Sequence, residues 1–171
     1  EEWYLTLHKA LYMEELIRKH GQIMDEYDPE KAVGLSVDEW GAWYDVEPGT
    51  NPGFLYQQNS LRDALVAGIT LNIFNKHSDR VRLACLAQMV NVLQSVILTE
   101  GEQMLLTPTY HVLHMYHYHQ DAHLLESSLE NVDFTGIDQI RVPKLTESVS
   151  VDDQGIITVT LANLSATEGE T

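Results

Sequence analysis

Apolar side chains recur at helical spacing at the start of the chain. The repeating residues are Trp3, Leu7, Ala10, Met13 and Ile17. Intervals of three and four positions bring such residues onto one face of an amphipathic helix. The pattern continues through Met24, and Pro29 disfavours a helical conformation just before it. The sequence therefore predicts one long helix that ends before Pro29.

A short apolar run comes next, within the stretch VGLSVDEWGAWYD (residues 33–45). Its first part, from Val33 to Glu39, is short enough for one strand. The segment 46–56 contains Pro48-Gly49 and Asn51-Pro52-Gly53, which are strong turn formers. We therefore predict a strand followed by an irregular loop.

A second helix is predicted after Ser60, which has the character of an N-cap residue. Asp63 lies in its first turn, where a negative charge is favourable beside the helix dipole. The apolar stripe consists of Leu61, Leu65, Ile69 and Ile73. Lys76 and His77 end the helix with basic groups.

Three further elements are predicted before residue 120. A shorter helix covers about residues 79–87. The nearly continuous apolar run VNVLQSVIL (residues 90–98) is typical of a strand that is buried on both faces. Thr107 and Pro108 form a helix start, with a cap and then proline at the first helical position, and this helix runs to about Tyr118.

The pattern changes after about Ala122. Val149 and Val151 alternate with polar residues, residues 152–155 form a turn, and alternation then resumes from Ile157 to Leu161. Such alternation predicts a β-hairpin in an antiparallel sheet with one face exposed to water. We expect two domains, residues 1–121 and residues 122–171.

Strands that alternate with helices in the first domain indicate an α/β fold with a parallel sheet. A complete (β/α)8 barrel takes about 250 residues, whereas only about 120 residues here have this alternation. If the first domain is barrel material, it is the closing third of a barrel. The chain is then expected to be a fragment of a longer protein.

Composition narrows the possible partners. The net charge is −16, from 26 acidic and 10 basic residues. Nucleic-acid binding depends on Lys and Arg to neutralise phosphates, so neither nucleic acid nor an anionic membrane surface is an expected partner. No run approaches the ~20 apolar residues of a membrane span. Cys85 is the only cysteine, and we expect it to be a buried small side chain.

The acid pair at the end of the first strand carries the clearest candidate chemistry. Functional residues of parallel α/β domains gather at the carboxyl ends of strands, and Glu39 lies at such an end. Strict alternation puts Glu39 on the face of Leu35 and Val37, and Asp38 on the opposite face. The two acids are therefore not expected to form a catalytic pair, and Glu39 is either catalytic or an ordinary polar residue at a strand end.

Aromatic and amide side chains surround this acid pair. The aromatic residues are Trp40, Trp43, Tyr44, Phe54 and Tyr56, and the amides are Asn51, Gln57, Gln58 and Asn59. Aromatic rings stack on the apolar faces of sugars, and amides bind sugar hydroxyl groups. Packing in the core is the alternative for any one of the rings.

Five histidines and one glutamine are the remaining candidates for binding a metal ion or a ligand. The histidines are His111, His114, His117, His119 and His123. No cysteine and no HExxH arrangement accompanies them, so we expect surface histidines and no metal site. Gln94 lies in the predicted strand 90–98, where a buried amide needs hydrogen-bond partners from the protein or from a ligand.

Three stretches together resemble the α-L-arabinofuranosidases of glycoside hydrolase family 51. They are VGLSVDEWGAWYDVEPGTNPGFLYQQNSLRDALVAGITLNIFNKHSDRV, AQMVNVLQSVILTEG and LTPTYHVLHMY. The residues from His123 onward resemble the start of that family's C-terminal β-sandwich. The resemblance implies strands seven and eight of a (β/α)8 barrel with their helices, followed by part of a sandwich.

The resemblance also implies roles for three residues. Glu39, in the DEW motif at the end of the seventh strand, corresponds to the nucleophile of a retaining mechanism. Trp43 corresponds to the tryptophan that shapes the sugar-binding end of the site, and Gln94 to the glutamine that contacts arabinose. The family's general acid/base glutamate belongs to an Asn-Glu motif, and this chain contains no Asn-Glu dipeptide.

The expected function is release of terminal α-L-arabinofuranosyl groups from arabinose-containing saccharides by the longer enzyme. The resemblance implies no cofactor or metal, a homo-oligomer and, together with the single cysteine, a cytoplasmic location. The isolated chain is expected to be inactive. Two alternatives stay open: a catalytically silent carbohydrate-binding or structural piece, and a related barrel glycosidase that acts on another sugar.

Overall fold

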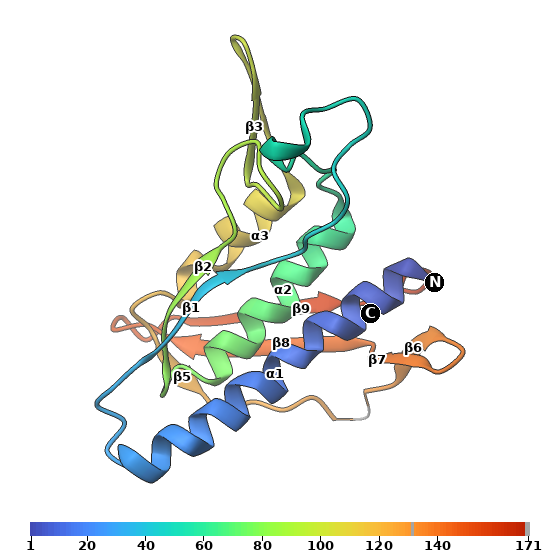
Figure 1. Ribbon diagram of the computed structural model, residues 1–171. Coiled ribbons are helices and arrows are strands. Elements are labelled where there is room, and N and C mark those ends of the chain that lie inside the picture. The colour runs from blue at the N-terminus through green and yellow to red at the C-terminus, as the bar shows by residue number, and fades with distance from the viewer. Residues whose placement is uncertain (131, 170–171) are drawn as a thin grey trace.

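The computed structural model describes residues 1–130 and 132–169 as a mixed arrangement of helices and strands (Figure 1). The helices are α1 (Glu2–Tyr27), α2 (Leu61–Lys76) and α3 (Pro108–Tyr116), with two 3-10 turns, η1 (Pro52–Phe54) and η2 (His117–His119). The strands are β1 (Leu35–Trp40), β2 (Val81–Leu86), β3 (Ile97–Glu100), β4 (Gln103–Leu106), β5 (His123–Leu125), β6 (Phe134–Ile137), β7 (Ile140–Pro143), β8 (Leu145–Val151) and β9 (Ile157–Asn163).

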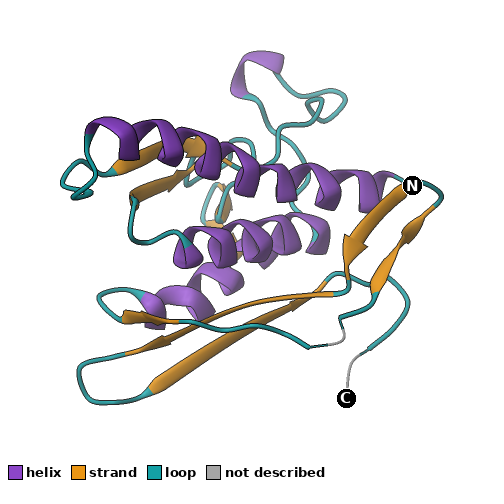
Figure 2. Ribbon diagram, turned by 90° about the horizontal axis from the view of Figure 1, so that it is seen from below, coloured by secondary structure: helices purple, strands orange, loops and turns teal. Residues whose placement is uncertain are grey.

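Helix α2 lies at the centre of the molecule. It packs along α1 and α3 and also contacts β8 and β9. Figure 2 shows α1 and α2 side by side, with the long β8–β9 hairpin running beneath them. The fully packed core is Leu7, Ile17, Trp40, Val66, Ala67, Ile69, Ile73, Phe74, Val81, Val142, Ala162 and Leu164. Because α2 has neighbours on several sides, it supplies the largest share of this core.

The predicted start of α2 is confirmed. Ser60 and Asp63 form a capping box, in which the backbone N–H of Ser60 donates to Asp63 Oδ2 at 2.7 Å. Such reciprocal bonds satisfy backbone groups that the first helical turn leaves without partners. The helix ends at Lys76, as predicted, and α1 also ends before Pro29.

Strands β1 and β2 pair in parallel, and α2 connects them, so the predicted β–α–β unit is present. The second strand is not the one that we expected, however. Residues 81–86 were predicted to be helical and instead form β2. Pairing with β1 overrides the helical preference of the Leu and Ala residues in this segment, since tertiary hydrogen bonds outweigh weak local propensities.

The strand predicted over residues 90–98 is wrong for residues 90–96, and only Ile97 and Leu98 belong to a strand, β3. Gln88, Asn91 and Leu93 have positive φ angles of 69°, 58° and 49°, which a regular strand does not tolerate. Residues 87–96 instead form a connection that ends in the β3–β4 hairpin, which projects from the body (Figure 1). The run is mostly apolar, as in a buried strand, but its polar residues Asn91 and Gln94 form side-chain hydrogen bonds to other segments.

Cys85 is exposed, which corrects the expectation that it is buried. It belongs to β2, and its side chain lies away from the core because α2 covers the opposite face of that strand. No helix in the described ranges is long and apolar enough to cross a membrane.

The hairpin predicted near the end of the chain is confirmed. Strands β8 and β9 pair over seven residues each, and β5 adds to the other edge of β8. A further hairpin in this part of the chain, β6–β7, is not predicted from the sequence, and it lies against α1. The predicted boundary at residue 121 falls between η2 and β5.

A buried polar network joins α2 to this sheet. Asn72 Oδ1 accepts hydrogen bonds from Ser148 Oγ at 2.9 Å, Thr160 Oγ1 at 3.0 Å and Tyr116 Oη at 3.0 Å. Burial raises the pKa of Tyr116 to about 12, so this phenol stays protonated and donates. The sheet therefore meets the helices through hydroxyl groups that converge on one amide.

His119 borders this network. Its Nδ1 lies 2.7 Å from Ser150 Oγ and its Nε2 lies 3.0 Å from Thr160 Oγ1. Burial lowers the pKa of His119 below its usual 6.5, because desolvation disfavours the imidazolium. The folded chain therefore favours the neutral ring, with one nitrogen donating and the other accepting.

We expect His119 to make stability depend on pH. A depressed folded-state pKa gives a contribution that is fully present above about pH 6.5 and is lost as the pH falls, since the unfolded chain then binds more protons. The variant His119→Gln should flatten this acid loss. Thermal unfolding of wild type and variant between pH 5 and 8 measures it, and parallel curves would contradict the assignment.

Candidate functional site

The carboxyl end of β1 carries the candidate acid. Val37 pairs with Ala84 and Trp40 pairs with Leu86, so two residues of β1, Asp38 and Glu39, lie opposite a single residue of β2. This bulge breaks the strict alternation of the strand. Trp40 therefore continues the buried face of Leu35 and Val37, and Glu39 does not lie on it. Our expectation that Glu39 shares that face is corrected.

The two acids differ in their surroundings. Both are exposed, but Asp38 accepts a hydrogen bond of 2.6 Å from Ser36 Oγ. The side chain of Glu39 has no hydrogen bond or ion pair to any residue that the structure describes. Of the pair, Glu39 is thus the carboxylate that is free to meet a ligand.

The residues after Glu39 turn sharply away from the strand. Trp40 is buried and meets Phe74 edge-on, with ring centroids 5.5 Å apart. Gly41 follows with a φ of +124°, and a Cβ atom there would come within 3.1 Å of Gln94 Oε1 and 3.2 Å of Leu86 Cδ1. Glycine is favoured at this turn because the positive φ strains any other residue and a Cβ atom would crowd both neighbours.

Gln94 lies directly behind this turn. It is fully buried, in the connection 87–96 rather than in a strand as predicted. Its Oε1 accepts from Ala42 N at 2.7 Å, and its Nε2 donates to Asp63 O at 2.7 Å and Thr109 Oγ1 at 3.3 Å. Both ends of the amide therefore bond to the protein itself.

Gln57 is buried, although the sequence predicts for it only an amide near the acid pair that could bind a sugar hydroxyl group. It is 2% exposed, its Nε2 donates to Ala42 O at 3.0 Å, and its Oε1 accepts from Tyr44 N at 2.8 Å. The only signal in the sequence was an amide pair, Gln57-Gln58, at the end of the aromatic loop. The sequence of this pair does not indicate which of the two glutamines is buried.

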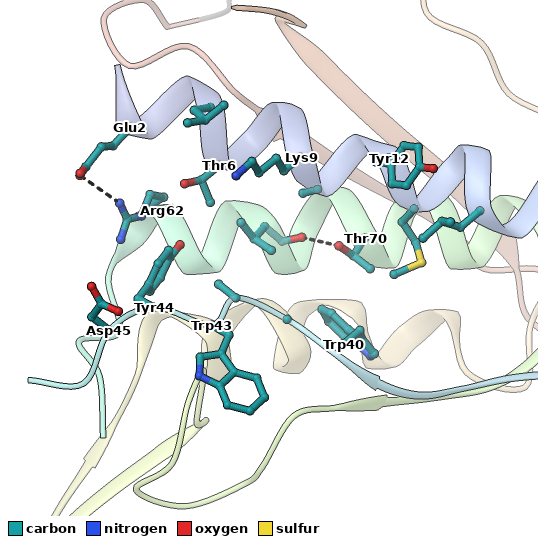
Figure 3. Close-up of a pocket in the computed structure, with 17 residues that line it drawn as sticks. Glu2, Thr6, Lys9, Tyr12, Trp40, Trp43, Tyr44, Asp45, Arg62 and Thr70 are labelled. Atoms are coloured by element: carbon teal, nitrogen blue, oxygen red, sulfur yellow. Dashed lines mark hydrogen bonds and ion pairs between the residues drawn. The ribbon is translucent and has the colours of Figure 1, made fainter. Parts of the chain in front are cut away.

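Trp43 projects from the segment that these two glutamines hold, and 65% of it is exposed. Figure 3 shows Tyr44 turned toward Arg62 and α1, whereas Trp43 points to the other side of the chain. Arg62 Cζ lies 4.2 Å from the centre of the Tyr44 ring, and burial raises the pKa of Tyr44. The segment and the start of α1 border a cleft of about 700 Å³.

The other aromatic residues of this region are divided between two roles. Trp40 belongs to the core, as its burial shows. Phe54 and Tyr56 border a second cleft of about 950 Å³, which lies between their loop and the β3–β4 hairpin. The exposed aromatic side chains Trp43 and Phe54 thus both belong to the segment that follows the carboxyl end of β1.

The histidines do not gather around a common point. His114 and His117 stack with centroids 5.3 Å apart, and His119 bonds to β8 and β9. Among residues 1–130 and 132–169, no group of three or more His, Cys, Asp or Glu side chains is arranged to hold a metal ion.

Comparison with known proteins identifies the relatives of this chain. Residues 38–169 match the family described as alpha-L-arabinofuranosidase C-terminal domain. An intracellular exo-alpha-L-arabinofuranosidase of Bacteroides ovatus is 46% identical over 170 residues, which is 99% of this chain and 33% of that protein.

Solved structures agree with this match. The GH51 arabinofuranosidase from Xanthomonas axonopodis pv. citri superposes with a TM-score of 0.94 at 52% identity, covering 97% of this chain and 34% of that one. An alpha-L-arabinofuranosidase from Thermotoga maritima, at 23% identity and a TM-score of 0.75, shares the fold. This chain spans about a third of the length of these relatives. Because the family match covers most of the chain, the protein belongs to the alpha-L-arabinofuranosidase C-terminal domain family, as the sequence resemblance indicated.

Proposed function

We propose that this chain is the C-terminal part of a retaining glycoside hydrolase of family 51, which releases terminal α-L-arabinofuranosyl groups from arabinose-containing saccharides. One observation carries the proposal: Glu39 is an exposed, unengaged carboxylate at the carboxyl end of a parallel strand, next to a turn that presents Trp43. Relatives named as arabinofuranosidases support it.

In this proposal, β1 and β2 are strands seven and eight of a (β/α)8 barrel. Residues 1–121 form the closing part of the barrel, and residues 122–171 form part of a β-sandwich. Strand eight is then β2, residues 81–86, and not the strand that the sequence predicts at residues 90–98. Gln94 then belongs to the connection after that strand, on the side where barrel enzymes carry their active sites.

Glu39 is proposed as the nucleophile. Its carboxylate forms a bond to the anomeric carbon while the bond from that carbon to the leaving oxygen breaks, and a second carboxyl group protonates this oxygen. Water then cleaves the glycosyl-enzyme and gives arabinose. The second carboxyl group is a glutamate outside these 171 residues, about 5–5.5 Å from Glu39 in the assembled site.

Trp43 is proposed to contact the sugar directly. Its exposed indole offers a flat apolar surface to one face of the ring. Gln94 was expected to contact arabinose, but both ends of its amide already bond to the protein. We therefore propose that Gln94 positions the sugar-binding segment through its hydrogen bond to the backbone N–H of Ala42.

The full-length enzyme is proposed to need no metal or cofactor and to form a homo-oligomer. The names of the Bacteroides ovatus and Bacillus subtilis relatives include the word intracellular, which supports a cytoplasmic location. The isolated chain is proposed to be inactive, because it supplies one of the two carboxyl groups.

The first test is the stereochemistry of hydrolysis by the full-length enzyme. With an aryl α-L-arabinofuranoside, proton NMR should detect α-arabinofuranose as the first-formed anomer, because two displacements at one carbon restore its configuration. A β anomer formed first would contradict the role of Glu39 as nucleophile.

The same assay separates the alternatives. Hydrolysis of an aryl β-D-xylopyranoside in preference to the arabinofuranoside would indicate a related glycosidase for another sugar. Binding of arabino-oligosaccharides with no release of aryl alcohol would favour the catalytically silent binding protein.

A further inference from the structure

The segment Gly41–Tyr44 begins where the backbone hydrogen bonds between β1 and β2 end, and side chains hold it in place. The last backbone bond between the two strand ends is from Ala87 N to Trp40 O at 2.8 Å. Beyond it, side-chain amides take over: Gln94 binds Ala42 N, and Gln57 binds both Ala42 O and Tyr44 N. A side-chain amide here takes the place of a peptide group in an adjoining strand.

We propose that Gln57 is a positioning residue for catalysis, an inference that rests on the proposed function. Its two hydrogen bonds, to Ala42 O and Tyr44 N, fix the backbone on either side of Trp43. This segment begins two residues after Glu39. In this way the two bonds hold the nucleophile and the sugar-binding indole in one geometry.

The chemistry of the amide explains why glutamine is needed at position 57. The same side chain must donate to a carbonyl and accept from an N–H two residues further on. Among the side chains of similar length, glutamate in its ionised form only accepts, lysine only donates, and methionine offers no comparable group. Gln57 is also buried, so water does not replace the lost bonds at low cost.

The exposure of Trp43 strengthens the inference. With 65% of the residue exposed, the indole is not fixed by close packing, so its orientation depends on the backbone that carries it. Tyr44, the next residue, is fixed at its ring by Arg62 and at its N–H by Gln57. Loss of the Gln57 bonds would leave the backbone between Gly41 and Tyr44 held only by the bond from Ala42 N to Gln94, on one side of Trp43.

The test uses three variants of the full-length enzyme: Gln57→Met, Gln57→Glu and Gln154→Met. Gln154 is the control for the same substitution, because it lies in the β8–β9 turn away from Glu39, is exposed, and has no side-chain hydrogen bond to the residues described. For Gln57→Met we expect kcat to fall about 100-fold, since displacement of reacting groups by about 1 Å costs this much. For Gln154→Met we expect kcat within about threefold of wild type, because no side-chain hydrogen bond is lost.

The Gln57→Glu variant gives a readout that a merely structural role would not move. A protonated carboxyl group donates to Ala42 O and accepts from Tyr44 N as the amide does, whereas the carboxylate repels the carbonyl oxygen. The ratio of its kcat to that of wild type should therefore rise as the pH is lowered from 8 to 5. For Gln57→Met the same ratio should stay constant.

Three results would overturn the inference. The first is a kcat for folded Gln57→Met within threefold of wild type, and the second is a loss that circular dichroism shows to match the unfolded fraction alone. Either of these, with Glu39→Ala inactive, would leave the proposed function standing. The third is full activity of Glu39→Ala, which would overturn both proposals, because Gln57 would then have no nucleophile to position.

Discussion

Replacing Glu39 with alanine in the full-length enzyme is expected to lower kcat/KM for an aryl α-L-arabinofuranoside by about 10⁴-fold or more. The carboxylate is the group that bonds to the anomeric carbon in the proposed mechanism, so its removal leaves only sugar binding and the second carboxyl group. The exposed position of Glu39 predicts that this loss is one of chemistry and not of folding. The unfolding midpoint should therefore change little.

The matched control is Asp38→Asn. The asparagine oxygen can still accept the hydrogen bond from Ser36, so its turnover should stay within about tenfold of wild type. If Glu39→Ala also stays within tenfold, the nucleophile assignment fails.

Chemical rescue makes the same prediction sharper. Azide should restore turnover of Glu39→Ala, because a small anion can occupy the space that the carboxylate leaves. The product should be a β-arabinofuranosyl azide, since a single displacement inverts the anomeric carbon. An α-azide, or rescue of Asp38→Asn instead, would point to another residue.

The elements that were predicted correctly are those that local interactions determine. Helix α2 could be located from Ser60 and Asp63, because a capping box needs only residues of one turn. The β8–β9 hairpin could be located from its alternation and its turn. In both cases the deciding contacts are close in the sequence.

The elements that were missed depend on distant contacts. The segment 81–86 is a strand because β1 lies beside it, about 45 residues earlier, and its own side chains favour a helix equally well. The connection 87–96 bends because Gln94 and Asn91 bond to other segments. Hydrophobicity alone therefore could not separate it from a buried strand.

The candidate site divides in the same way. Glu39 could be singled out because it lies at the end of one predicted strand, and Trp43 because of the resemblance to family 51. The bulge that changes the direction of Glu39 depends on the register against β2, which no single-strand pattern contains. The role of Gln57 depends on burial that only the folded backbone creates.

The contact between the helices and the β8–β9 sheet shows how a polar interface can replace an apolar one. Ser148 and Thr160 face α2, whereas Val159 and Leu161 of β9 are more than half exposed. A hydroxyl-rich face buries well only if each hydroxyl group finds a partner. Asn72 supplies that partner for several of them at once, so the stability of the interface is concentrated in one side chain.

We expect the variant Asn72→Leu to lose about 3 kcal/mol of unfolding free energy in this region of the full-length enzyme. Leucine fills a similar volume, so the loss comes from three hydroxyl groups that no longer have their acceptor rather than from a cavity. Ser148, Thr160 and Tyr116 can recover only part of it through their remaining bonds.

Amide hydrogen exchange of α2 and β8 measures this loss, because it reports the opening of one region independently of the others. Asn75→Leu is the matched control: Asn75 lies one turn later on the same helix, is partly buried, and makes one hydrogen bond, to Ser148 Oγ. It should cost about 1 kcal/mol or less. Equal losses for the two variants would show that the stability is spread along the interface, and the central role of Asn72 would then be wrong.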